Sequence, residues 1–153
     1  MVDRHPGLKA SVFDLPALES SFSKHMAALG APDSISFHGG DFFTDPLPEA
    51  DALVFGHVLH NWNTEARKHL LSNAYQALRP GGAVYIYDPM TNDENPRLHS
   101  VLTSLNMLVW TAGGHRYTAE ECRALLTEAG FRPDPPDPSD AHDEVLVIGR
   151  KER

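Results

Sequence analysis

The chain has 153 residues, a length typical of one domain, and a formal net charge of −8 from 13 basic and 21 acidic residues. An acidic chain of ordinary globular composition is poorly suited to bind nucleic-acid phosphates or an anionic membrane. No apolar run approaches the roughly 20 residues that span a bilayer, and the start of the chain lacks the apolar segment of a signal peptide. The single cysteine, Cys122, excludes an internal disulfide. We therefore expect a cytoplasmic chain with no nucleic-acid and no membrane partner.

Apolar residues recur with helical spacing in some segments and form short β-rich runs in others. In chain order the pattern predicts a strand at 9–13, a helix at 18–29, strands at 35–38 and 52–56, a helix at 64–78, a strand at 83–87, helices at 98–110 and 118–130, and a strand at 144–149. The run at 52–56 is apolar almost throughout, which is typical of a strand buried on both faces. Prolines make 131–140 a linker or an irregular edge. Alternating strands and helices predict a single α/β domain with a mostly parallel sheet.

In open α/β sheets, ligands bind at the carboxyl ends of the strands. The predicted strand ends carry these polar residues: Asp14, Asp41, His60 and Asp88. Asp14 can accept hydrogen bonds from both hydroxyls of a ribose, but an aspartate in this place also commonly caps a turn or helix. Asp41 can lie near an adenine amine with Phe42 packed on the ring, or it can be a turn residue before two core phenylalanines.

His57 and His60 are three positions apart, a spacing that can ligate a metal on a helix. They straddle a strand end and no third ligand has suitable spacing, so we expect no metal site. His60 can instead serve as a general base near neutral pH, although an isolated histidine would favour a structural role. Trp62 offers the flat apolar surface that lines many pockets. The sequence contains no phosphate-binding GxGxxG or GxxxxGK[ST] loop and no GxSxG serine elbow.

Several short motifs follow one another along the chain. They are VFDLP at 12–16, GDFF at 40–43, DPLP at 45–48, HVLHNW at 57–62, LRPGG at 78–82 and LNMLV at 105–109. In this order they closely resemble the class I S-adenosylmethionine-dependent O-methyltransferases of small molecules, of the plant caffeate, bacterial polyketide and animal hydroxyindole type. The resemblance covers nearly the whole chain, and the ordered set is specific although each motif alone is weak. It implies a Rossmann-like methyltransferase sheet.

The resemblance also implies an activity, the transfer of a methyl group from S-adenosyl-L-methionine to a hydroxyl of a small, aromatic molecule. The position of Asp14 would hold the cofactor ribose, and Asp41 and Phe42 would line the adenine site. His60 would be the general base on the acceptor hydroxyl, with Asp88 orienting it. The acceptor pocket would be lined by Trp62, Asn106, Met107 and Trp110. The sequence does not identify the acceptor.

The chain departs from the family pattern in three ways. The helical dimerisation domain of the family has no counterpart, and the glycine-rich cofactor loop should lie roughly 20 residues before Asp14, where the chain has only 13 residues. Arg116 stands where the family often has a glutamate, and a cation cannot orient a histidine as a carboxylate does. We therefore expect an N-terminally truncated, partial methyltransferase domain over 1–153. Because the missing strand would be central, we expect a homo-oligomer or a missing N-terminal part to cover the unpaired edges.

Two alternatives remain open. The chain can be a non-catalytic remnant, or a subunit of a split methyltransferase that needs a partner for cofactor binding. It can also be another α/β nucleotide-binding protein, such as an NAD enzyme, but that class needs the same glycine-rich loop and does not account for the HVLHNW motif.

Overall fold

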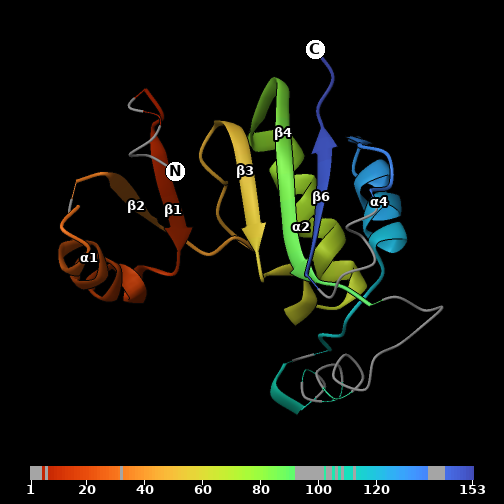
Figure 1. Cartoon of the computed structure of the whole chain (residues 1–153), viewed down its shortest axis with the longest axis horizontal. Coiled ribbons are helices and arrows are strands. Elements are labelled where there is room, and N and C mark those ends of the chain that lie inside the picture. Colours follow the sequence, from red (N-terminus) through yellow and green to blue (C-terminus); the bar gives the residue numbers. More distant parts are fainter. Residues whose placement is uncertain are drawn as a thin grey trace. The chain divides into compact units, whose positions relative to one another are not determined.

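A computed structural model describes residues 5, 7–31, 33–91, 102, 105, 107, 109–111, 113–137 and 144–153. The chain forms two compact units, Met1–Pro48 and Glu49–Arg153. The first holds a two-stranded sheet and the second a four-stranded sheet (Figure 1). No helix among the described residues is both long enough and apolar enough to cross a membrane.

The first unit is a strand–helix–strand segment. β1 (Ala10–Asp14) runs parallel to β2 (Ile35–Gly39), and the connection contains the short 3-10 helix η2 (Pro16–Leu18) and α1 (Glu19–Ala28). Phe22 of α1 packs against Phe37 of β2, with ring centroids 5.3 Å apart. The strands predicted at 9–13 and 35–38 and the helix predicted at 18–29 are confirmed within one residue at each end.

The second unit contains β3 (Ala50–Gly56), η3 (Leu59–Asn61), α2 (Thr64–Ala77), β4 (Leu78–Pro89), α4 (Ala119–Glu128), β5 (Arg132–Pro133) and β6 (Glu144–Arg150). The strand order is β3-β4-β6-β5; β3 and β4 are parallel, while β6 is antiparallel to both of its neighbours (Figure 1). Parallel β1–β2 and β3–β4 pairs with connecting helices confirm the predicted α/β class. Of the helix predicted at 98–110, the described residues 102, 105, 107, 109 and 110 are helical.

One face of the four-stranded sheet forms the core of this unit. Val84 and Ile86 of β4 and Val147 of β6 are buried on it, and α2 and α4 pack against these strands and against each other. α4 begins at a capping box in which Thr118 accepts from the Glu121 backbone N–H at 3.0 Å, while the Glu121 carboxylate accepts from the Thr118 N–H at 2.8 Å. These reciprocal bonds satisfy two donors at the helix start.

The prediction that β3 is buried on both faces is wrong. Phe55 is 7% exposed, whereas its neighbour Val54 is 67% exposed. Val54 shares the second face of the sheet with Tyr87 and Leu146, which are 43% and 45% exposed. The reason is that α2 and α4 cover a single face, so alternate residues of β3 point away from the core. Among the described residues, β3 also has a strand partner on one edge only.

The LRPGG segment at 78–82 has glycines that are typical of a turn after the predicted helix, but in the structure it belongs to a strand. α2 ends at Ala77 and β4 already begins at Leu78, with a register shift opposite Ala50 and Ala52. The Gly81 and Gly82 backbone pairs with Lys151, through bonds of 3.1 and 2.9 Å. Pairing with the chain beyond β6 therefore extends the strand through a segment whose glycines indicated a turn.

Candidate functional site

His60 and Asp88 meet at the carboxyl ends of two parallel strands. His60 lies in η3, just after β3, and Asp88 is the penultimate residue of β4. The His60 ring Nδ1 lies 3.0 Å from Asp88 Oδ1, and the His60 backbone N–H donates to Asp88 Oδ2 at 2.9 Å. His60 is 7% exposed and Asp88 is completely buried. The two residues singled out as base and orienting group thus lie in direct contact.

This contact decides which ring nitrogen of His60 carries the proton. A carboxylate only accepts hydrogen bonds, so the partner of Asp88 Oδ1 is the protonated form of Nδ1. The neutral imidazole then keeps its lone pair on Nε2. A histidine in this tautomer can take a proton at Nε2, and the adjacent carboxylate stabilises the imidazolium that forms.

Tyr117 and Arg67 complete the surroundings of Asp88, and the sequence analysis missed both. The Tyr117 hydroxyl donates to Asp88 Oδ2 at 2.9 Å. The Arg67 guanidinium lies 4.2 Å above the Tyr117 ring, and its Nε donates to the Leu59 carbonyl at 2.9 Å. Burial lowers the pKa of Arg67 and raises that of Tyr117. One sequence signal could have flagged Arg67, because it stands three and four positions before the buried Leu70 and Leu71, on the apolar face of α2.

Arg116 stands where the resemblance implies a second carboxylate. Its guanidinium is directed to a backbone carbonyl. Arg116 is 7% exposed, and its guanidinium donates to the Met90 carbonyl, one residue beyond β4. The structure therefore shows Arg116 bonded to backbone next to the site.

His57 lies beside His60 but has different partners. Its Nε2 is 3.2 Å from Glu144 Oε2, and its ring lies edge-on to the rings of His60 and Tyr87, with centroids 5.8 and 5.6 Å away. It has a φ of 56°, which is unusual for a residue other than glycine. Within the described part of the chain, no group of three or more His, Cys, Asp or Glu side chains is arranged to hold a metal ion.

In the first unit, Asp14 and Asp41 lie at one edge of the β1–β2 sheet. The Gly40 N–H donates to the Asp14 carbonyl at 2.9 Å, which joins the ends of the two strands. Asp14 Oδ1 accepts from the Leu15 N–H at 2.8 Å, and Asp41 Oδ1 accepts from the Phe43 N–H at 2.9 Å. Each aspartate therefore stabilises a turn, which is the structural role given above as the alternative to cofactor binding. A contact between these aspartates and a cofactor stays a prediction. A contact between the cofactor and Phe42, which is half-buried, also stays a prediction.

The structure describes three of the four residues expected to line the acceptor pocket. Trp62 is the C-cap residue of η3, two positions after His60, and it is half-buried. Met107 is half-buried and Trp110 is 78% exposed. Asn106 lies outside the described residues. An acceptor role for all four remains a prediction.

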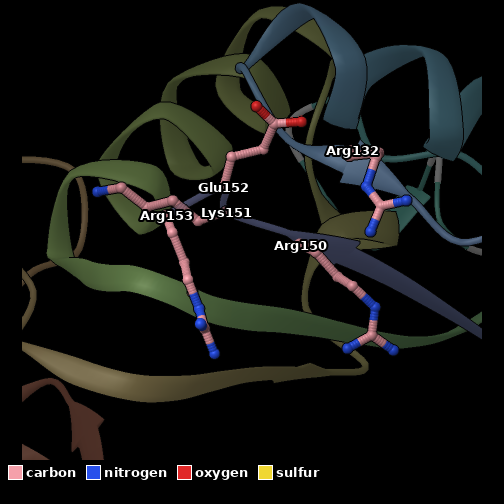
Figure 2. Close-up of a pocket in the computed structure, with 6 residues that line it drawn as sticks. Arg132, Arg150, Lys151, Glu152 and Arg153 are labelled. Atoms are coloured by element: carbon pink, nitrogen blue, oxygen red, sulfur yellow. The ribbon is translucent and has the colours of Figure 1, made fainter.

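A cavity of about 400 Å³ lies beside Gly81, near the start of β4, whereas Asp88 lies near the end of that strand. Figure 2 shows residues that line this cavity. It is lined by Gly81, Arg132, Arg150, Lys151, Glu152 and Arg153. Arg150 forms a 2.7 Å ion pair with Asp134, and the Lys151 ammonium donates to the carbonyls of Tyr75 and Leu78, both at 2.7 Å. Two of its cations thus already have protein partners, and the cavity is separate from the His60–Asp88 site.

Comparison with known proteins gives consistent matches. A family model described as an O-methyltransferase domain matches residues 1–132. The chain is 45% identical over 150 residues to the tetracenomycin polyketide synthesis 8-O-methyl transferase TcmO of Streptomyces glaucescens, a match that covers 97% of this chain and 44% of that protein. It is 44% identical over 128 residues to the N,N-dimethyltransferase OxyT of Streptomyces rimosus, covering 84% of this chain and 37% of that protein.

A solved structure is similar along the same region. Human N-acetylserotonin methyltransferase in complex with SAM superposes with a TM-score of 0.86 at 33% identity, covering 99% of this chain and 43% of that one. The chain thus spans less than half the length of each of these three proteins.

Proposed function

Because the chain belongs to the O-methyltransferase domain family and has its Rossmann-like α/β fold, we propose that it is the catalytic part of an S-adenosyl-L-methionine-dependent O-methyltransferase. The acceptor is a hydroxyl of a small, aromatic molecule. The observation that carries this proposal is the buried His60–Asp88 contact, with Nδ1 to Oδ1 at 3.0 Å. It supplies a base of the kind that removal of a hydroxyl proton requires.

The chain's residues suit the nucleoside end of the cofactor. Asp14 and Asp41 present carboxylates at one edge of the β1–β2 sheet, and each uses Oδ1 for its own turn. Among the described residues no protein group engages Oδ2 of Asp14 or Asp41, so this oxygen can accept from a ribose hydroxyl or an adenine amine. Phe42 adds an aromatic ring beside Asp41. When bound, the cofactor supplies an electrophilic sulfonium methyl group.

The protein's task in the reaction is to align the acceptor, exclude water and remove one proton. Alignment of the two reactants supplies most of the acceleration in such reactions. His60 takes the acceptor proton at Nε2, a contribution of about 10²- to 10⁴-fold. Asp88 keeps the Nδ1 proton in place and stabilises the resulting imidazolium. Trp62, Asn106, Met107 and Trp110 would contact the acceptor.

A nitrogen acceptor is the second candidate. The relative OxyT is named an N,N-dimethyltransferase, and its sequence identity to this chain, 44%, is close to the 45% of TcmO. His60 could remove a proton from a protonated amine as well as from a hydroxyl. Mass analysis of products from matched phenol and aniline acceptors distinguishes the two atoms.

We further propose that, in the active form, additional polypeptide covers the face of the four-stranded sheet that lies opposite α2 and α4. We call this face the open face. Val54, Tyr87 and Leu146 place exposed apolar surface on that face, and β3, which carries Val54, has no strand partner on its outer edge among the described residues. Exposed apolar patches and free strand edges are typical of interaction surfaces. A second copy of this chain, or the N-terminal part whose absence the sequence analysis expects, would supply the cover. We also propose a cytoplasmic location, with which the single cysteine of the chain is consistent.

Calorimetric titration with S-adenosylmethionine and S-adenosylhomocysteine tests cofactor binding directly. We expect heat of binding that Asp14→Asn abolishes and Asp51→Asn preserves, because Asp51 is an exposed residue paired with Arg79 in the second unit. No heat and no shift of the melting temperature at millimolar cofactor would overturn autonomous binding and favour the split-subunit or remnant alternatives. With an accepted substrate, His60→Ala should lower turnover by about 10²- to 10⁴-fold.

A further inference from the structure

We propose that Tyr117 and Arg67 are positioning residues that hold the His60–Asp88 pair in the geometry of a proton acceptor. The structural part of this inference concerns the tautomer of His60, and its consequence for turnover rests on the proposed function. Neither residue belongs to the motifs that carry the family resemblance. Both are almost completely buried, at 1% exposure each.

Tyr117 determines how the oxygens of Asp88 are shared. Oδ2 accepts from the Tyr117 hydroxyl and from the His60 backbone N–H, both at 2.9 Å. Two donors on one oxygen fix the rotation of the carboxylate about its Cβ–Cγ bond and direct Oδ1 toward the His60 ring. Since Oδ1 is then available to Nδ1 at 3.0 Å, the proton stays on Nδ1 and the lone pair stays on Nε2.

The Tyr117 hydroxyl remains a donor wherever His60 can act as a base. Burial raises the phenol pKa well above 10, and the nearby Asp88 raises it further. A phenol that stays protonated cannot repel the carboxylate. Tyr117 therefore supports Asp88 across the whole range in which a histidine titrates.

Arg67 joins the two segments that carry His60 and Tyr117. From α2, its guanidinium donates to the carbonyl of Leu59, the residue before His60, and to the carbonyl of His115, two residues before Tyr117. It also stacks on the Tyr117 ring at 4.2 Å. A planar group with five donors can make these contacts at once, whereas an ammonium cannot.

The burial of Arg67 has an energetic cost that packing does not require. Burial lowers its pKa, which shows the loss of hydration of the charge, and an apolar side chain would avoid that loss. The compensating charge attraction comes from Asp88, and the neutral ring of Tyr117 adds a cation–π contact at 4.2 Å. The arginine's charge is thus placed to favour the ionised carboxylate that orients His60.

The decisive variant is Tyr117→Phe, which removes one hydroxyl and retains the ring under Arg67. Tyr75→Phe is the matched control, because Tyr75 also lies under a cation, Lys151 at 4.6 Å, and against another aromatic ring. We expect ¹⁵N NMR of histidine-labelled protein to show His60 mainly protonated on Nδ1 in the wild type and in Tyr75→Phe. In Tyr117→Phe the form protonated on Nε2 should rise to a comparable population.

Turnover gives the second readout. With an accepted substrate, Tyr117→Phe should lower kcat about tenfold, as the loss of a supporting hydrogen bond to a site residue commonly does, and leave the cofactor KM unchanged. An unchanged His60 tautomer in Tyr117→Phe would overturn the inference. Because NMR needs no turnover, an inactive wild type with the expected NMR result would contradict only the proposed function.

Arg67 is tested by comparing Arg67→Lys with Arg67→Met in the same NMR experiment. Lysine keeps the charge without the planar fork, and methionine removes both. The role of Arg67 is supported if the population of His60 protonated on Nδ1 is lower in Arg67→Lys than in the wild type and lower again in Arg67→Met. Equal populations in folded variants overturn it, and if Arg67→Met does not fold, the Lys variant decides alone.

Discussion

Asp88 binds His60 twice, taking the ring Nδ1–H on Oδ1 and the backbone N–H on Oδ2. Tyr117 also donates to Oδ2, so the two oxygens have different partners. The rest of the site depends on this asymmetry, because it makes the two ends of the carboxylate chemically distinct.

The asymmetry predicts that Asp88→Asn will reverse the His60 tautomer. Two fixed donors meet Oδ2, so the amide oxygen takes that position and the NH₂ group takes the place of Oδ1. His60 Nδ1 must then accept, which moves the proton to Nε2 and removes the base. We expect ¹⁵N NMR to show this reversal, and turnover to fall by about 10²- to 10⁴-fold. Asp51→Asn should leave the His60 tautomer and turnover unchanged, because Asp51 is an exposed aspartate paired with Arg79.

Gly114 predicts a second effect, on the turn that carries His60. A Cβ at Gly114 would lie 2.6 Å from the carbonyl oxygen of Asn61, and that oxygen belongs to backbone. Gly114→Ala must therefore displace η3 or its own loop, and overpacking of this kind costs about 1–3 kcal/mol. Urea titration should show that loss. Gly56→Ala is the control, since a Cβ at Gly56 meets nothing within 4 Å; equal losses in the two variants would contradict the steric explanation.

Cys122 predicts how stability changes at alkaline pH. Burial raises the pKa of its thiol to about 12, from 9.0 for an unperturbed thiol. The contribution to stability is complete below pH 9 and is lost as pH rises from 9 toward 12, because only the unfolded chain ionises there. The free energy of unfolding should therefore fall by roughly 1 kcal/mol between pH 8 and 10, and less in Cys122→Ala.

The same thiol provides a direct chemical measurement. Cys122 is the chain's single cysteine, so a thiol reagent reports on it alone. We expect no reaction at pH 8 in the native protein and complete reaction in denaturant, because the thiolate is the reactive form. Rapid labelling of the native protein would contradict the burial of Cys122 in α4.

The open face of the sheet predicts self-association. Val54 is 67% exposed on β3, which in the described part of the chain pairs along one edge only, so replacing Val54 with lysine should cost little folding stability and weaken contact with a second copy. Light scattering over a concentration series should show a lower apparent mass for Val54→Lys. Leu29→Lys is the control, because Leu29 is 63% exposed in the other unit. A wild-type chain that is monomeric at every concentration would leave the covering role to an N-terminal part.

The local pattern of residues was sufficient to predict most of the elements. Apolar spacing predicted α1 and α2, and the helix predicted at 118–130 is α4, which begins at the Thr118 capping box. These signals are readable because they act between residues three or four positions apart. The polar residues Asp14, His60 and Asp88 were identified for a similar reason, since each lies at the end of its strand or within four residues of it.

The sequence itself determined the order of strands and helices and the chemical types available at the strand ends. Only the tertiary structure decided that Asp88, 28 positions after His60, gives its two oxygens to two different donors of that residue, and that Tyr117 and Arg67 support them. It also decided that Val54 is exposed, which an apolar run cannot reveal. The physical reason is that strand register and helix packing bring these groups together across the chain, and no local periodicity records which face of a strand a distant helix will cover.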